Sequence, residues 1–285
     1  MKIRINGVDA DIQPETEKTV GELLAALDTW LTGSGHRLSG LAIDGKTIHA
    51  DDLEDCFGRA IDTVDTLDIS ANSVLELLAE SLFQVLQDIE AYEAAGFASF
   101  EEKSSFAGHW QETPEAHLLA EQSPDLFNWA LKTFSGEGSG PQALRILVEE
   151  RLRELQNPAD EMEKVKPLIE EICVRLEEIP LDIQTGKDAR AAETVNAFSG
   201  IAEKVFRVYY VLKAEGFPVG EIRVADMPVA AYITEFDTAM RELLAAYEEH
   251  DTVLVGDIAE YEMAPRLRGF YAAVLELITK EMTRR

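Results

Sequence analysis

The stretch Thr185-Gly186-Lys187-Asp188 has the residue types of a phosphate-binding loop. A Gly-Lys pair ahead of a helix is how such a loop ends, because its backbone N–H groups and its lysine surround the phosphates. The complete motif has a first glycine five positions before the second, a Ser or Thr after the lysine, and a β-strand ahead of it. Here the first position is Leu181, the residue after the lysine is an aspartate, and the preceding segment has a helical pattern. We therefore predict no nucleotide binding at this stretch.

A structural role is the favoured interpretation of the same four residues. Thr185 and Asp188 have the spacing of a capping box, and an aspartate in the first turn also suits the helix dipole. The stretch is then a loop between two helices followed by a helix start. The alternative is a contact surface for a partner at the tip of this helical hairpin, formed by Thr185, Gly186, Lys187 and Asp188.

Other groups of reactive side chains are less specific. The acidic run at 49–56 offers oxygen ligands without the spacing of a calcium loop, and His109 and His117 are too far apart for one helix face. Cys56 and Cys173 form no metal-ligand pair, and both are expected to be reduced thiols. We therefore expect no enzyme activity, cofactor or metal. The abundant carboxylates leave one alternative open, an enzyme with a carboxylate-based site in a helical pocket.

The net charge of −28 is spread along the chain, with −8 in residues 1–70 and −20 in the remainder. Nucleic acids and anionic membranes are disfavoured as partners because both require a basic face. A basic protein remains a suitable partner. The N-terminus lacks the apolar run of a signal peptide, and no stretch reaches the roughly 18 apolar residues of a membrane span. A cytoplasmic protein is expected.

A β-hairpin is predicted at the start of the chain. Alternating apolar residues flank Asn6-Gly7, a pair that tolerates the positive φ angles of a type I′ turn. A helix follows, because Thr19 and Glu22 have the spacing of a capping box ahead of residues with helical periodicity. The N-terminal region therefore combines paired strands with a single helix.

A second turn signal, Asp44-Gly45, and a final strand at 65–70 complete this region. The order of hairpin, helix and short strands resembles the ubiquitin-like β-grasp fold over about the first 70 residues. Ubiquitin-like modifiers end in a free Gly-Gly carboxylate, whereas this chain continues from Ser70 into a helix. The resemblance therefore implies a fold and does not imply conjugation chemistry.

From Asn72 onward the apolar residues recur with the period of a helix. Three prolines stand where helices are expected to begin: Pro114, Pro124 and Pro141. The last part has four helical patterns with short connections, which an antiparallel bundle accommodates most economically. The predicted fold class is α+β, with a β-grasp domain at 1–70, a helical segment at 72–157 and a four-helix bundle at 158–285.

The clearest helical pattern covers 160–179, where a heptad-like stripe indicates a face packed in the bundle. Its members are Met162, Val165, Ile169, Ile172, Leu176 and Ile179. Pro180 is expected to end this helix, and Pro265 is expected to distort the last one.

The segment 184–198, which reads QTGKDxxAxxTxxxF, resembles helical proteins encoded beside flagellar genes in bacteria. That resemblance implies a context of flagellar assembly. We expect a non-enzymatic adaptor or chaperone-like protein whose partner is basic or presents an amphipathic helix. A structural subunit of an oligomer is the remaining alternative. The sequence leaves open the partner, the oligomeric state and whether 72–157 is a separate domain.

Overall fold

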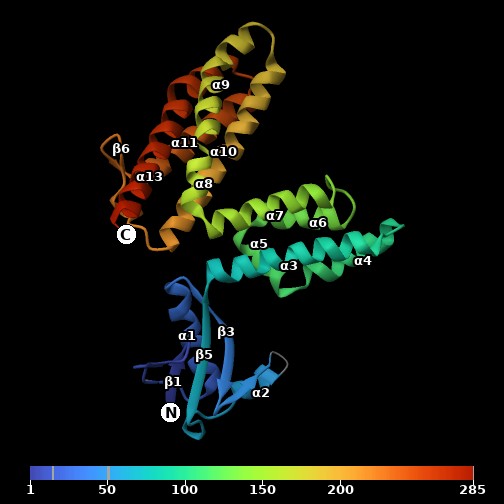
Figure 1. The fold of residues 1–285 in the computed structure, drawn as a ribbon, viewed down its shortest axis with the longest axis vertical. Helices are drawn as coiled ribbons and strands as arrows, with labels where there is room; N and C mark the ends of the chain where they lie inside the picture. Colours follow the sequence, from blue (N-terminus) through green and yellow to red (C-terminus); the bar gives the residue numbers. More distant parts are fainter. Residues whose placement is uncertain (15, 50–51, 285) are drawn as a thin grey trace. The chain divides into compact units, whose positions relative to one another are not determined.

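A computed structural model describes residues 1–14, 16–49 and 52–284. The chain is α+β, as predicted, with a mixed five-stranded sheet followed by helices (Figure 1). The strands are β1 (Lys2–Ile5), β2 (Val8–Ala10), β3 (His36–Ile43), β4 (Lys46–Ile48) and β5 (Thr66–Ser73). Their order in the sheet is β2-β1-β5-β3-β4, and only the β1–β5 pair is parallel.

Both predicted hairpin turns are confirmed. Asn6 and Gly7 have φ angles of 50° and 78°, and Asp44 and Gly45 have φ angles of 52° and 79°. Positive φ at both central residues is the requirement of a type I′ turn. Asn6 has a second role, because its side-chain amide accepts from the backbone N–H of Ala71 and donates to the carbonyl of the same residue, at 2.9 and 2.8 Å. The first turn thereby also fixes the end of the central strand β5.

The helix α1 (Val20–Gly33) has the predicted capping box at Thr19 and Glu22, and its apolar face packs with the sheet. Leu23, Leu27 and Leu31 are buried in a core shared with strand residues such as Leu67. The connection to β5 contains two short helices, α2 (Leu53–Phe57) and the 3₁₀ turn η2 (Ile61–Thr63).

Five helices follow the sheet: α3 (Val74–Ala95), α4 (Phe100–Gln111), α5 (Pro114–Gln122), α6 (Pro124–Phe134) and α7 (Pro141–Gln156). The three prolines begin α5, α6 and α7 as predicted, where their missing N–H has no helical partner in any case. Contacts group residues 1–148 into one compact unit and 149–285 into another. The division into three domains stays a prediction.

The second unit is an up-and-down bundle (Figure 1). Its helices are α8 (Pro158–Lys164), α9 (Lys166–Gln184), α10 (Asp188–Ala214), α11 (Val229–Glu248), α12 (Thr252–Ile258) and α13 (Ala264–Arg284). A 3₁₀ turn, η3 (Val219–Glu221), and a hairpin of β6 (Arg223–Val224) and β7 (Met227–Pro228) connect α10 to α11. The π turn η4 (Ala259–Met263) joins α12 to α13.

The predicted helix at 160–179 is wrong in its boundaries. Val165 separates α8 from α9, because Pro167 in the first turn of α9 has no N–H to continue the hydrogen-bond pattern. Pro180 does not end α9, which continues to Gln184. A Cβ on Gly256 of α12 would lie 3.1 Å from Cγ of Pro180, so α12 packs closely over the proline ring. Tertiary packing therefore offsets the lost hydrogen bond.

The expected distortion near Pro265 lies one turn earlier, as the π turn at Ala259–Met263. Pro265 cannot donate to the carbonyl of Tyr261, and its ring would clash in a regular helix. A π turn adds one residue to the helical turn and provides the space that the ring needs. The predicted distortion of the last helix is thus confirmed, and it lies in the turn before the proline.

Candidate functional site

Three of the four residues predicted for the hairpin tip lie in the loop between α9 and α10, and the fourth, Asp188, begins α10. The predicted capping box is absent. Lys187 takes the N-cap position of α10 and makes no side-chain cap. The hydroxyl of Thr185 donates instead to the carbonyls of Leu181 and Asp182, at 2.8 and 3.2 Å. Gly186 has φ +72°, the conformation that ends many helices. The motif therefore terminates α9 rather than starting α10.

Lys187 pairs with the buried carboxylate of Asp182. Its Nζ lies 3.9 Å from Oδ1 of that residue, and a guanidinium nitrogen of Arg190 lies 3.3 Å from the same oxygen. A buried carboxylate needs such cations because an unpaired charge is costly away from water. Lys187 therefore helps to balance the buried charge near the end of α9.

We expect Lys187→Ala to leave nucleotide binding unchanged, because the parent protein should not bind nucleotides. Isothermal titration calorimetry with ATP and Mg²⁺ should give no binding heat for either protein. Micromolar ATP binding by the parent that Lys187→Ala removes would contradict this interpretation of the loop.

A small pocket adjoins this tip, with a volume of about 310 Å³. Of the four predicted residues, only Asp188 lines it. The other lining residues come from α9 (Ile183), α10 (Ala191), α11 (Tyr247), the α11–α12 connection (His250) and α12 (Thr252 and Val255). The predicted contact surface is thus only partly brought together.

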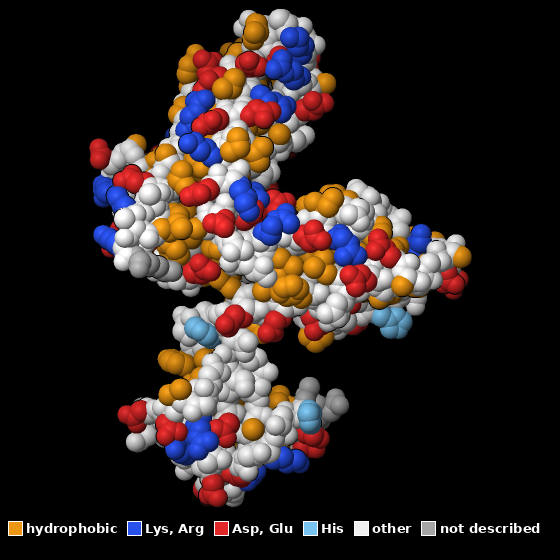
Figure 2. Space-filling model, in the orientation of Figure 1, with side chains coloured by type: hydrophobic (Ala, Val, Ile, Leu, Met, Phe, Trp, Pro, Cys, Tyr) orange, Lys and Arg blue, Asp and Glu red, His pale blue; other side chains and the backbone are white. Residues whose placement is uncertain are grey.

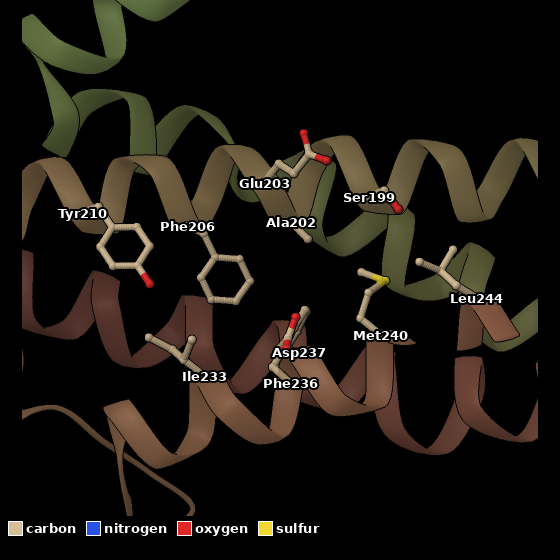
Figure 3. Close-up of a pocket in the computed structure, with 10 residues that line it drawn as sticks. All are labelled: Ser199, Ala202, Glu203, Phe206, Tyr210, Ile233, Phe236, Asp237, Met240 and Leu244. Carbon is tan, nitrogen blue, oxygen red and sulfur yellow. The ribbon is translucent and has the colours of Figure 1, made fainter. Parts of the chain in front are cut away.

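A groove between α10 and α11 is the stronger candidate (Figure 3). Its volume is about 320 Å³, and five residues of each helix line it. The α10 wall consists of Ser199, Ala202, Glu203, Phe206 and Tyr210, and the α11 wall of Ile233, Phe236, Asp237, Met240 and Leu244. Both walls have the spacing i, i+3, i+4, i+7 and i+11, which places each set on a single helix face.

Aromatic side chains form the floor of this groove. The rings of Phe206 and Phe236 lie 5.0 Å apart, and Phe206 also packs on Phe270 of α13 at 4.7 Å. Phe236 is buried, whereas Tyr210 and Leu244 at opposite ends are about half exposed. Exposed aromatic and aliphatic side chains beside a hollow are typical of protein-binding grooves.

Two acidic residues stand midway along the groove, Asp237 on α11 and Glu203 on α10, and the carboxylate of Glu203 points outward from the rim of α10, away from α11 (Figure 3). Each has an arginine four residues further along its own helix. Glu203 is 3.8 Å from Arg207, and Asp237 is 2.8 Å from Arg241. Both carboxylates remain largely exposed to solvent.

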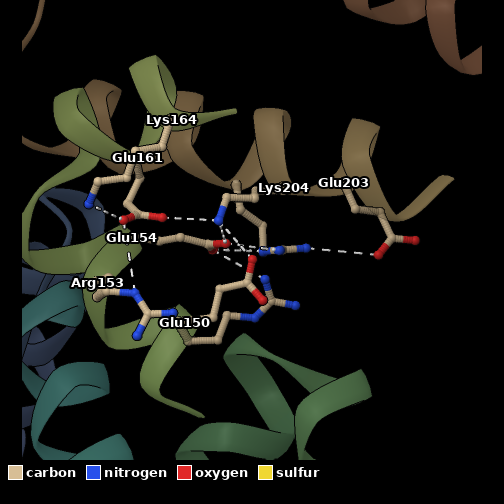
Figure 4. Close-up of polar contacts among 9 residues, drawn as sticks. Glu150, Arg153, Glu154, Glu161, Lys164, Glu203 and Lys204 are labelled. Atoms are coloured by element: carbon tan, nitrogen blue, oxygen red, sulfur yellow. Dashed lines mark hydrogen bonds and ion pairs between the residues drawn. The ribbon is translucent and has the colours of Figure 1, made fainter. Parts of the chain in front are cut away.

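A buried ion cluster holds the side of α10 next to the groove wall in place (Figure 4). Lys204 contacts Glu150 of α7 at 2.7 Å and Glu161 of α8 at 3.0 Å. Arg207 donates two hydrogen bonds to Glu154 of α7, at 2.9 and 3.1 Å. Lys204 and Arg207 thus contact the cluster, while the preceding residues Glu203 and Phe206 line the groove, so the cluster fixes the orientation of the α10 wall.

The ionisation of the cluster is set by burial and by its cations. Burial raises the pKa of the Glu154 carboxyl to about 7, despite the opposing attraction of Arg151 and Lys204. For Glu161 burial also acts to raise the pKa, but hydrogen bonds from Lys164 and Lys204 outweigh it and hold the pKa below its usual value. The carboxylates of Glu150 and Glu161 hold the pKa of Lys204 above its usual value, against its own burial.

The α10–α11 groove was not predicted from the sequence. The signal was a second apolar row on α10, formed by Ala202, Phe206 and Tyr210, beside the row that packs in the core. Such a row is visible only when two faces of one helix are examined separately. The ion cluster had no comparable signal, because its partners Glu154 and Lys204 are 50 residues apart in sequence.

No group of three or more His, Cys, Asp or Glu residues in the described part of the chain is placed to hold a metal ion. Asp51, within the acidic run at 49–56, lies outside the described residues. Among the described helices, none has the length and apolar character needed to cross a membrane. Acidic side chains appear on both compact units in the face shown in Figure 2.

Comparison with known proteins gives similarities to two families. Residues 1–73 match the family described as TP0873 N-terminal domain, and residues 160–273 match a domain of unknown function, DUF8042. An uncharacterized protein of Treponema pallidum (strain Nichols) is 22% identical over 277 residues, which is 97% of this chain and 98% of that protein. No solved structure matches the chain. Both walls of the α10–α11 groove fall within residues 160–273.

Proposed function

We propose that this protein is a non-enzymatic, cytoplasmic interaction module, an adaptor or chaperone-like protein that binds an amphipathic segment of a partner protein. The observation that carries the proposal is the α10–α11 groove, with its aromatic floor and half-exposed apolar ends. Binding of an amphipathic helix through its apolar face in such a groove is a common mode of peptide recognition.

The N-terminal sheet belongs in this proposal as a ubiquitin-like β-grasp domain. Its strand order β2-β1-β5-β3-β4, its parallel central pair β1–β5 and its single long helix support that assignment. The chain passes directly from β5 into α3, so the end of this sheet has no free carboxylate. A binding role for this domain follows more naturally than a conjugation role.

We place the interaction in the assembly of bacterial flagella. The support is the motif at 184–198 and its resemblance to helical proteins encoded beside flagellar genes. A chaperone-like protein in that setting would shield the apolar face of a client segment from water. Burial of such a face is favourable by about 25 cal/mol per Å² of apolar surface.

Leu244→Glu should weaken partner binding at least tenfold without unfolding the bundle, because Leu244 is 44% exposed at the end of the groove. A charge there would be desolvated by an incoming apolar segment. Val174→Glu on α9 is the matched control, since Val174 is 49% exposed and does not line the groove.

The experiment compares proteins captured by each variant after crosslinking in the native cell, with quantitative mass spectrometry. Partners retained by the parent and by Val174→Glu should be lost from Leu244→Glu, while all three proteins melt at similar temperatures. An identical partner set for Leu244→Glu would contradict a role for the groove.

A further inference from the structure

We infer that the groove selects a helix that carries lysine or arginine near the middle of its apolar face. This inference rests on the proposed function, because it names the chemistry of the partner that the groove binds. Three features of the groove carry it: the length of the walls, the way in which they meet, and the charges between them.

The walls define the length of the occupant. Each wall extends over twelve positions, from Ser199 to Tyr210 and from Ile233 to Leu244. At 1.5 Å per residue, a wall is about 17 Å long, or about three helical turns. The walls are antiparallel, so Tyr210 faces Ile233 at one end and Leu244 lies near Ser199 at the other (Figure 3). A helix of three to four turns fits this length.

The seam between the walls is open to such a helix. α10 and α11 meet at the level of Phe206 and Phe236, whose rings form an edge-to-face pair. Ile233 and Met240 are only partly buried above that floor. Apolar residues at both ends of the partner's binding face would therefore cover groove surface that is exposed to water in the free protein.

The charge within the groove has one sign. The ten lining residues described above include two carboxylates, Glu203 and Asp237, and no lysine or arginine. The arginines that pair with Glu203 and Asp237 compete only weakly with a cation of the partner. Arg241 is strongly exposed, and Arg207 is already hydrogen-bonded to Glu154. Exposed pairs of this kind are weak, because solvent screens both charges.

A cation on the flank of a bound helix would reach the carboxylate on one rim of the groove, and the bound helix would partly shield that contact from water, where charge attraction is stronger. An acidic residue at the same place would face a like charge. The net charge of −28 also attracts basic segments and repels acidic ones before contact. The occupant is therefore apolar at both ends of its face and basic at the centre.

Two synthetic 16-residue peptides, stapled into helices and labelled with fluorescein, test this inference. They share leucines at i, i+3, i+7 and i+11, and they differ only in two central flanking residues, which are lysine in one and glutamate in the other. Fluorescence anisotropy with the full-length protein at physiological salt should show the lysine peptide binding at least tenfold more tightly. The double variant Glu203→Lys/Asp237→Lys should reverse this preference.

The matched control is Glu193→Lys/Glu242→Lys, which changes the net charge equally on the same two helices at exposed positions outside the groove. This control should retain the preference of the parent. A reversal by the control equal to that of the groove variant would show that overall charge selects the peptide, and it would overturn the inference.

The remaining outcomes separate the inference from the proposed function. If both peptides bind with equal affinity and Leu244→Glu weakens both, the groove binds helices without charge selection, and only the inference is wrong. If neither peptide binds, or if Leu244→Glu has no effect on either, the groove does not bind amphipathic helices, and the proposed function is wrong with it.

Discussion

Ile169→Asp is expected to unfold the bundle at temperatures where the parent is stable. Ile169 is 2% exposed and lies in the main core of residues 149–285. Truncation of a buried isoleucine costs about 2–5 kcal/mol, and the buried carboxylate adds a further desolvation cost. A domain of ordinary stability has only about 5–15 kcal/mol in total.

Leu168→Asp is the matched control for this prediction. Leu168 is the neighbouring residue of α9 and is 46% exposed, so the same new charge would remain in water. Thermal melting followed by circular dichroism should show a large loss for Ile169→Asp and a small change for Leu168→Asp. If Ile169→Asp melted within a few degrees of the parent, the stripe that contains Ile169 would be an exposed partner surface.

The apolar stripe along α8 and α9 shows what helical periodicity can predict. All six of its predicted members are buried, from Met162 to Ile179, although the helix boundaries around them were wrong. Burial of these six residues can be predicted from helical spacing alone, because the apolar face of an amphipathic helix packs away from water. Boundaries depend on single hydrogen bonds, and the contact between Pro180 and Gly256 shows that a distant residue decides whether a proline ends a helix.

Turns were predictable where their backbone requires particular residues. Asn6-Gly7 and Asp44-Gly45 both form the predicted hairpins. The small hairpin of β6 and β7 was not predicted, because Ala225 has positive φ without a glycine to indicate it. Its conformation is imposed by the surrounding structure rather than favoured by the residue.

The Thr185–Asp188 motif was misinterpreted because capping residues serve both ends of helices. A threonine between two helices can accept from the N–H groups that follow or donate to the carbonyls that precede. Thr185 does the second, toward Leu181 and Asp182. The direction depends on where α9 ends, and sequence analysis had placed that end five residues too early, at Ile179.

Lys204→Met is expected to destabilise the bundle by about 3–5 kcal/mol, the usual cost of removing one partner from a buried ion pair. The methionine keeps most of the aliphatic stem but removes the cation that Glu150, Glu154 and Glu161 share. Glu154 and Glu161 are almost completely buried, so water cannot replace the lost contact.

Lys213→Met in the last turn of α10 is the control, because that lysine is exposed. Urea unfolding of the full-length protein at pH 7.5 should give a lower midpoint for Lys204→Met and a nearly unchanged midpoint for Lys213→Met. Equal midpoints for Lys204→Met and the parent would mean that the cluster contributes no net stability.

The stability deficit of Lys204→Met should shrink as the pH falls from 7.5 to 5.5. In the parent, burial already raises the pKa of Glu154 to about 7, and the loss of Lys204 removes an attraction that opposes this rise. Glu161, whose pKa the same lysine helps to lower, should also shift upward. A carboxyl whose folded-state pKa lies above its unfolded value binds more protons when folded. Its stabilising contribution is therefore present at low pH and lost as the pH rises through the folded-state pKa.

The measured quantity is the difference in unfolding free energy between parent and variant at each pH, because the titration of all other groups cancels in that difference. For Lys204→Met the difference should be smaller at pH 5.5, where protonation of Glu154 removes a charge that Lys204 no longer balances. For Lys213→Met it should be the same at both values. A deficit of Lys204→Met that did not change with pH would show that Glu154 stays ionised beside its remaining cations, so that Lys204 acts through packing rather than charge.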